Sequence, residues 1–387
     1  MESQNSLSHE TNRLFAIDHI RLFIIILVVI VHANVTYSGF GRWFIMDDGG
    51  QTLASSLIFG IFNSFSQAYF MGFLFLIAGY FTPRSYNKKG IKLFIKDRFT
   101  RLGLPTLFFM FFVGPLTRFL VIVSESGNLP NVFKFYTKVV FDYKIIGRTG
   151  PMWFTLALLF FSIIYALLRH YVLDHLKTQN RPYEIGHQNV ILTILLITVI
   201  AFLIRLVQPI GTAIFNMQLC FFAQYILLFY IGLAAYKHNW LNTLSFEFGI
   251  KWFKLGIGIG LPFWLAIMLL GGFIEGKDYL YFGGMYWQSL AYTLWESFYC
   301  IAMVLGLTVI FRDKLSKRNN ITQFMSDNAF GVYVFHTPVL VLLTVLFRSV
   351  LLPPLLKALV VICLAIPLSF LTSHFIRKSK AMRKLLV

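Results

Sequence analysis

The chain is built from long apolar stretches separated by short polar segments. Each stretch holds some twenty residues, enough to cross the roughly 30 Å hydrocarbon core of a bilayer as an α-helix. The predicted spans are residues 14–36, 53–81, 102–123, 151–170, 189–207, 217–236, 252–271, 287–311, 327–347 and 354–376. We therefore predict an all-α polytopic membrane bundle of ten transmembrane helices, with an uncertainty of one.

The composition supports a membrane protein, and the distribution of charges predicts its orientation in the membrane. Hydrophobic residues make up 57% of the 387 residues and charged residues only 13%, which excludes a soluble globular protein. With ten spans both termini share one side, and 23 of the 34 Lys and Arg residues fall on that side. The positive-inside rule therefore places both termini in the cytoplasm. The net charge of +18 is explained by this topology and indicates no nucleic-acid partner.

The domain organisation follows from the spans. We predict a cytoplasmic tail over residues 1–13, one membrane domain over 14–376 and a basic cytoplasmic tail over 377–387. The tail before the first span has no basic cluster followed by a small-residue cleavage site, so that span is expected to remain as an anchor. The longest early connections are the predicted cytoplasmic loop 82–100 and the predicted external loop 124–151.

Arg21 and His32 are the strongest candidates for chemistry, because both lie within the first apolar stretch. Eleven residues make almost three helical turns, so both side chains project from one face, roughly 16 Å apart along the axis. An arginine in hydrocarbon costs at least about 2.5–3.5 kcal/mol, which favours a functional role. The structural alternative is that Arg21 extends to the cytoplasmic surface and His32 sits at the opposite interface.

Arg98 and Arg101 lie where the third predicted span leaves the cytoplasm. If this segment is helical, their spacing of three places two guanidinium groups on one face, which suits phosphate groups. A purely topological role for the two charges stays equally open.

Two carboxylates also stand out. Asp18 precedes Arg21 by three residues and can hold its guanidinium in place. Glu296 lies within the eighth span, where a carboxylate needs a partner, and Arg21, His32 or a bound substrate are candidates. We predict a catalytic role for Glu296, with a structural ion pair as the alternative.

His336 lies in the ninth span just before Pro338, which leaves a backbone carbonyl near residue 334 unpaired. A histidine there can satisfy that carbonyl, so a structural role is favoured. No nucleophile-elbow, zinc-protease or P-loop motif is present. Three widely spaced cysteines support neither disulfides nor a metal site, so no metal is expected. They are Cys220, Cys300 and Cys363.

Several of these residues resemble motifs of the acyltransferase 3 family of integral-membrane acyltransferases. The stretch 17–32 is similar to the family's Arg-x10-His motif, including an aspartate before the arginine. Four further matches follow in the family's order along nearly the whole chain. They are Phe75–Tyr80, with Ala78 in place of the usual serine, Arg98-x-x-Arg101-Leu-Gly-Leu-Pro105, Met152–Leu158, and Tyr333-x-x-His336-x-Pro338.

The resemblance implies an O-acyltransferase in a bacterial cell membrane. It would move an acetyl or succinyl group from cytoplasmic acyl-CoA, a co-substrate, to a hydroxyl of an extracytoplasmic carbohydrate, as in O-acetylation of a polysaccharide. No cofactor is expected. A phosphopantetheine arm is of the order of the roughly 16 Å between Arg21 and His32. A secondary transporter or flippase of a polar or lipid-linked substrate is the alternative class, although no inverted halves with broken helices are evident.

On this reading His32 acts as general base or as transient acyl carrier, two roles that the sequence leaves open. Glu296 orients His32 or the acceptor. The remaining roles concern the two substrates: Arg21, Arg98 and Arg101 bind the CoA phosphates, Asp18 orients Arg21, Trp153 lines the acceptor side by resemblance, and Tyr333 and His336 are structural or site residues.

Overall fold

The computed structural model describes residues 2–142, 145, 147–172 and 184–386, and all regular elements in this part of the chain are helical. Within it, nine helices are long and apolar enough to cross a membrane. They cover Phe15–Ser38, Leu53–Ser126, Gly150–Tyr171, His187–Val207, Leu219–Lys237, Phe246–Leu270, Trp287–Lys314, Asn320–Phe347 and Pro354–Ile376. The predicted polytopic helical bundle is confirmed.

The 74-residue element Leu53–Ser126 contains two of the predicted spans. A straight helix of that length would be roughly 110 Å long, more than three times the hydrocarbon thickness. Gly90 interrupts it with φ 67° and ψ 170°, so the chain changes direction there. The nine helices therefore correspond to the ten predicted spans. The segment 82–100, expected to be a loop, is helical on both sides of Gly90, because polar residues at a membrane surface can continue a helix.

Most helices begin and end close to the predicted span limits. The long helices are α1 (Glu2–Ser38), α2 (Leu53–Arg98), α4 (Gly114–Ser126), α6 (Trp153–Tyr171), α7 (His187–Val207), α8 (Phe222–Lys237), α10 (Phe246–Leu270), α12 (Trp287–Lys314), α13 (Asn320–Phe347) and α14 (Pro354–Ile376). Shorter elements are η1 (Phe99–Gly103), α3 (Leu104–Phe108), η2 (Phe109–Val113), α5 (Val132–Val140), η4 (Gly150–Met152), η6 (Leu219–Phe221), α9 (Trp240–Thr243), α11 (Tyr279–Phe282) and α15 (Lys380–Leu385). Side-chain caps begin several of these helices, such as Thr52 before α2 and Asn319 before α13.

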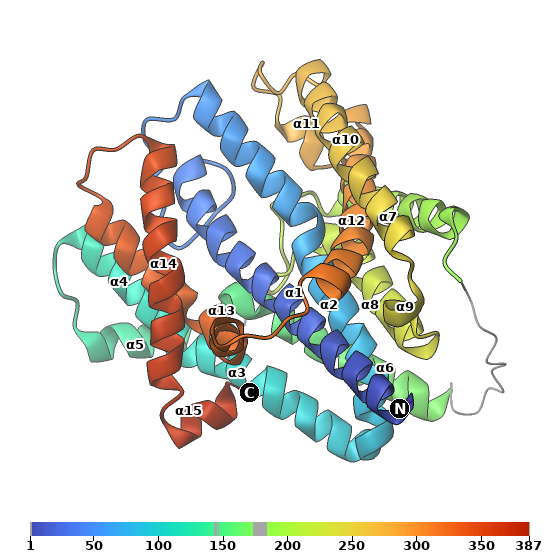
Figure 1. Cartoon of the computed structure of the whole chain (residues 1–387). Coiled ribbons are helices and arrows are strands. Elements are labelled where there is room, and N and C mark those ends of the chain that lie inside the picture. The colour runs from blue at the N-terminus through green and yellow to red at the C-terminus, as the bar shows by residue number, and fades with distance from the viewer. Residues whose placement is uncertain (1, 143–144, 146, 173–183, 387) are drawn as a thin grey trace.

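Both chain ends lie at the lower edge of the view in Figure 1. We call this end of the bundle, which carries both termini, the inner end, and the opposite end the outer end. An even number of spans requires the two termini to share one end. That the inner end faces the cytoplasm stays a prediction from the charge distribution, part of which falls on Lys177 and Arg181, outside the described residues.

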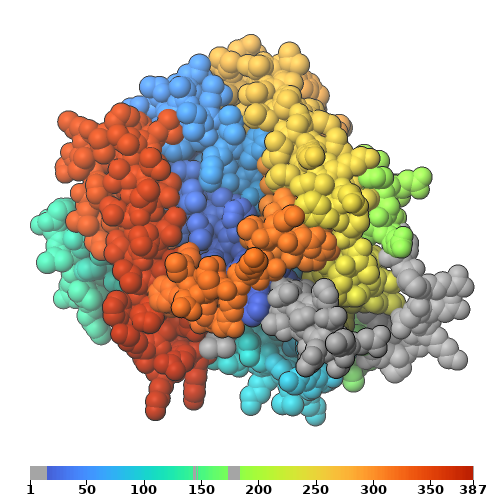
Figure 2. Space-filling model, viewed as in Figure 1, coloured from blue at the N-terminus to red at the C-terminus, as the bar shows by residue number. Residues whose placement is uncertain are grey.

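Helix α1 runs through the middle of the bundle and packs against α2, α12, α13 and α14. Ile24 and Val29 on α1 are almost completely buried. Figure 2 shows α1 at the bottom of a hollow, between α14 in red and α2 in light blue. The helix that carries Arg21 and His32 is therefore surrounded by other helices along much of its length.

Helices α2 and α8 cross closely, through small residues on both helices. A Cβ added to Gly232 of α8 would overlap the carbonyl oxygen of Leu76, and one added to Gly79 of α2 would overlap that of Phe229. Small residues at a membrane helix crossing allow the backbones to approach and gain dispersion contacts. The missing side chains therefore set the distance between α2 and α8.

This crossing gives a stability prediction. Gly232→Ala should lower the free energy of unfolding by about 1–3 kcal/mol, because the new methyl group forces the two backbones apart. Thermal unfolding in detergent measures the change. Gly258→Ala on α10 is the matched control, since no atom lies within 4 Å of a Cβ there, and it should be neutral or slightly stabilising. Equal melting temperatures for both variants would contradict the role of the crossing.

Candidate active site

Two histidines from distant parts of the chain meet inside the bundle. His32 of α1 and His336 of α13 approach to 2.9 Å between Nδ1 of His32 and Nε2 of His336. Their rings are nearly parallel, at 9°, with centroids 5.1 Å apart. His336 is fully buried and His32 is partly buried. His336, for which the sequence favoured a structural role, is thus the direct partner of His32.

For two neutral rings, the contacts of His336 determine where the protons lie. Nδ1 of His336 faces the backbone carbonyl oxygens of Tyr333 at 2.9 Å and Val332 at 3.2 Å. Because a carbonyl only accepts, this nitrogen carries the proton and Nε2 is an acceptor. Nδ1 of His32 must then donate to it, which leaves Nε2 of His32 with a free lone pair. The arrangement makes His32 a base.

Tyr333 connects the histidine pair to the segment that precedes α6. It is buried, its hydroxyl donates to the carbonyl oxygen of Pro151, and its ring stacks on His336 with centroids 6.3 Å apart. Trp153, predicted on the acceptor side, lies two residues further on and stacks on Tyr225 of α8 at 5.7 Å. Tyr333, His336 and the start of α6 are therefore one packed unit.

Two connections fold back from the outer end into the bundle and touch each other. In the segment before α6, Thr149 is fully buried and Gly150 packs against the ring of Phe109. The connection between α7 and α8 meets this segment, where Asn216 Nδ2 donates to the carbonyl oxygen of Gly150 at 2.8 Å. Within the predicted external loop 124–151, the described residues include helix α5. These segments form the outer wall next to Trp153 and Tyr333.

At the inner end, Arg21 lies three turns before His32 on α1. Its Nη1 is 3.5 Å from Oδ1 of Asp18, and the two side chains are 53% and 46% exposed. The predicted contact between these two residues is present. An exposed guanidinium held by one carboxylate keeps most of its donors available for an anion.

Arg98 and Arg101 differ in their surroundings although they are three residues apart. Arg98 ends α2, is partly buried and lies over the ring of Phe94 at 4.8 Å. Arg101 lies in the π-helical turn η1, is exposed and pairs with Asp97 at 3.0 Å. The segment that carries Arg101 is therefore π-helical where the prediction assumed an α-helix. Asp97 also binds Lys89 at 2.7 Å, so its charge is shared.

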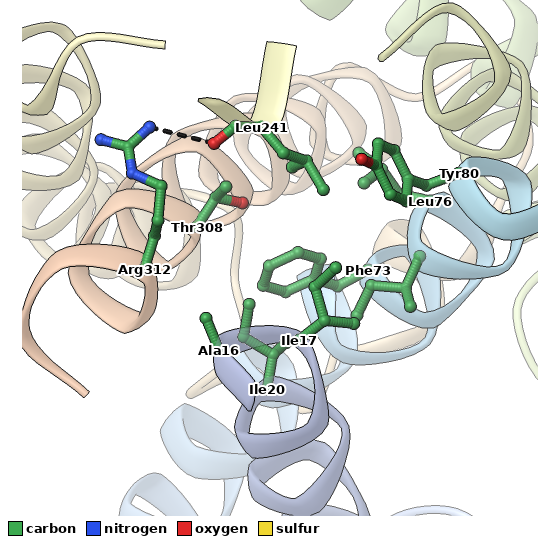
Figure 3. A pocket seen from close by; sticks show the side chains of 10 residues that line it. Ala16, Ile17, Ile20, Phe73, Leu76, Tyr80, Leu241, Thr308 and Arg312 are labelled. Carbon is green, nitrogen blue, oxygen red and sulfur yellow. Dashed lines mark hydrogen bonds between the residues drawn. The ribbon is translucent and has the colours of Figure 1, made fainter. Parts of the chain in front are cut away.

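Arg312 at the inner end of α12 is engaged in a structural contact. It lines a narrow apolar cavity of about 20 Å³ between α1, α2 and α12, shown in Figure 3. Its Nη1 donates to the carbonyl oxygens of Leu241 at 3.1 Å and Leu244 at 2.7 Å. The cavity has room for about one water molecule. Arg312 therefore ties α12 to the segment around α9 and, unlike Arg21, is not free for an anion.

Glu296 is paired with Arg205, a residue that the sequence analysis did not single out. Oε2 of Glu296 lies 2.5 Å from Nη2 of Arg205, whose Nη1 also donates to Thr293 at 2.7 Å. Arg205 is 0% and Glu296 4% exposed. The carboxylate is thus held by Arg205 and not by Arg21 or His32. An arginine inside an apolar span is the same signal that identified Arg21, and would have found Arg205. The catalytic role of Glu296 stays a prediction.

The comparisons with known proteins agree with this architecture. A family model described as an acyltransferase domain matches residues 14–374, nearly the whole chain. The protein is therefore a multi-pass membrane acyltransferase. It belongs to the acyltransferase 3 family. No curated protein and no solved structure gives a significant match. Among the described residues, no group of three or more His, Cys, Asp or Glu side chains is arranged to hold a metal.

The Arg205–Glu296 contact makes a prediction about Glu296→Gln. Removal of one charge leaves Arg205 buried without a counter-ion, so the free energy of unfolding should fall by about 3–5 kcal/mol. Thermal unfolding in detergent tests this. Glu275→Gln is the control, because Glu275 forms an exposed pair with Lys277, and its melting temperature should stay close to that of the wild type.

Turnover per folded molecule separates the two roles of Glu296. A structural carboxylate leaves the specific activity of the remaining folded Glu296→Gln protein close to that of the wild type. A sharp loss of turnover at an unchanged melting temperature would instead assign Glu296 to catalysis.

Proposed function

We propose that the protein transfers an acyl group, acetyl or succinyl, from acyl-CoA to a hydroxyl group of a carbohydrate acceptor at the outer face of a bacterial cell membrane. The observation that carries the proposal is the hydrogen bond between His32 and His336. It leaves one unprotonated imidazole nitrogen inside a membrane-embedded bundle of an acyltransferase family member.

The chemistry follows from that nitrogen. Nε2 of His32 accepts the proton of the acceptor hydroxyl while the hydroxyl oxygen attacks the thioester carbonyl carbon. A carbon–oxygen bond forms and the carbonyl oxygen becomes an oxyanion. The carbon–sulfur bond then breaks, and the proton on His32 passes to the departing CoA sulfur. His336 holds the His32 ring and its tautomer throughout, and is therefore a positioning residue.

Acyl-CoA would enter from the inner end. Arg21, oriented by Asp18, is available for a CoA phosphate. The roughly 16 Å along α1 from Arg21 to His32 fits a phosphopantetheine arm lying beside the helix. Arg98 and Arg101 would add phosphate contacts at the same end of the bundle. The acceptor would approach the outer wall that Trp153 and Tyr333 help to form.

A direct test uses the purified protein in liposomes with acetyl-CoA and an oligosaccharide acceptor. Release of CoA thiol together with acetylated acceptor, detected by mass spectrometry, is the expected result. Passage of the oligosaccharide across the bilayer without thiol release would favour a transporter and overturn the proposal.

The histidine pair makes a graded prediction for turnover. His32→Ala should reduce turnover by about a hundredfold or more, because the general base is lost. His336→Gln should retain much more activity than His336→Leu, since a glutamine oxygen can still accept from Nδ1 of His32. Turnover and thermal unfolding of each variant test this.

The control for the histidine pair is His170→Ala, which removes a histidine at the inner end of α6 and should leave turnover unchanged. Wild-type turnover in His32→Ala would contradict the assignment of His32 as general base. Equal turnover in His336→Gln and His336→Leu would contradict the role of the hydrogen bond.

The donor site makes a prediction for binding. Arg98→Ala should weaken binding of acetyl-CoA, measured by calorimetry, by more than Arg101→Ala, because Arg101 is already partly neutralised by Asp97. Arg98→Lys should restore binding only in part, since an ammonium group lacks the two-pronged phosphate contact. Lys92→Ala, on the exposed face of the same helical segment, should bind normally. Unchanged affinity in both alanine variants would reject phosphate recognition by this pair.

A further inference from the structure

Trp43 belongs to the connection between α1 and α2, residues 39–52, and contacts His32 directly. The indole and imidazole rings are stacked, with centroids 3.9 Å apart and an angle of 16°. His32 lies six residues, or about 9 Å, before the end of α1 at Ser38. Trp43 therefore reaches back from the outer end of the bundle onto the ring proposed as the base.

The connection is fastened to the bundle by residues that follow Trp43. Asp47 forms an ion pair with the buried Lys357 of α14 at 2.6 Å, and its backbone N–H donates to the carbonyl oxygen of Thr36 at 2.9 Å. Ile45 is buried against Val121 and Val341. These contacts, with the four helices α1, α4, α13 and α14, hold the segment directly after Trp43 in place. The stack is thus a built feature of the fold.

The indole N–H of Trp43 is buried and has no hydrogen-bond partner among the described residues. Indole Nε1–H is a donor only, and a buried donor without a partner is destabilising. Trp252 and Trp264 of α10 also carry such an N–H. Trp43 differs from them because its ring lies on the imidazole of a candidate base. An unpaired donor beside a base needs an explanation of its own.

We infer that Trp43 donates its indole N–H to the carbonyl oxygen of the acyl group while the acceptor hydroxyl attacks. The inference rests on the proposed function and adds a catalytic residue to it. When the carbon–oxygen bond forms, negative charge develops on the carbonyl oxygen, and a fixed donor in a water-poor site stabilises it. When the carbon–sulfur bond breaks, the carbonyl reforms and the contact weakens. His32 handles the proton and Trp43 the oxyanion.

The test compares variants that remove the donor with one that removes the whole ring. Trp43→Phe keeps an aromatic ring on His32 without the N–H. Incorporation of β-(3-benzothienyl)alanine at position 43 keeps the size of the indole and replaces the N–H by sulfur. For both we expect kcat to fall about 10²-fold, with KM for acetyl-CoA little changed, because the contact strengthens only in the transition state.

Trp43→Ala also removes the cover of His32. It should therefore show the same loss of transfer together with a higher ratio of CoA release to acetylated acceptor, since water gains access to the site. The matched control is Trp252→Phe. It deletes a buried, unpaired indole N–H near another histidine, His187, and should leave kcat unchanged.

The outcomes separate this inference from the proposed function. If the wild type transfers acetyl groups and kcat stays within about twofold in both Trp43→Phe and the benzothienyl variant, the role of the indole N–H is overturned. The proposed function then still stands. Absence of transfer by the wild type overturns the proposed function and this inference with it. The benzothienyl variant decides the matter if Trp43→Phe is unstable, because its ring fills the same volume.

Discussion

The hydrogen bond between His32 and His336 is the interaction around which the site is arranged. It joins the first span to the ninth, across 304 residues of sequence, inside the helical bundle. Each of its nitrogens has one defined role, because His336 is held by backbone carbonyls on one side and by His32 on the other. The bond therefore stabilises the crossing of α1 and α13 and prepares a base in the same contact.

Other buried ionic groups also need a partner, and they form ion pairs. Arg205 and Glu296 neutralise each other, and Lys357 pairs with Asp47 at the outer end. A buried ion pair gains little net stability against its desolvation, but removal of one partner is expensive. Each pair joins two separate elements: α7 to α12 in one case, and the connection that carries Trp43 to α14 in the other. The two ion pairs position the elements that they join more than they stabilise the fold.

Much of the fold could be predicted from the sequence, because a membrane span is a local property of some twenty consecutive residues. The segment 82–100 could not, since its polar composition suits a loop and a surface helix equally well. The helical face shared by Arg21 and His32 could also be predicted from the sequence, as could the short-range contact of Arg21 with Asp18. The partner of His32 was not, because a single histidine in a span carries no signal of what faces it from another helix. Trp43 lies in a glycine-containing connection without periodicity, so only the fold brings it to His32.

A membrane-embedded acyltransferase must expose reactive polar groups in a place where unpaired polar groups are costly. In this bundle nearly every polar group near the histidines is satisfied: Nδ1 of His336 by carbonyls, Nε2 of His336 by His32, and the hydroxyl of Tyr333 by Pro151. Nε2 of His32 keeps a lone pair, and among the described residues the indole N–H of Trp43 has no acceptor. One of these groups lacks a donor and the other lacks an acceptor. A hydroxyl group attacking a thioester carbonyl supplies both at once, because its proton passes to Nε2 of His32 while the carbonyl oxygen accepts from the indole N–H of Trp43 in the transition state.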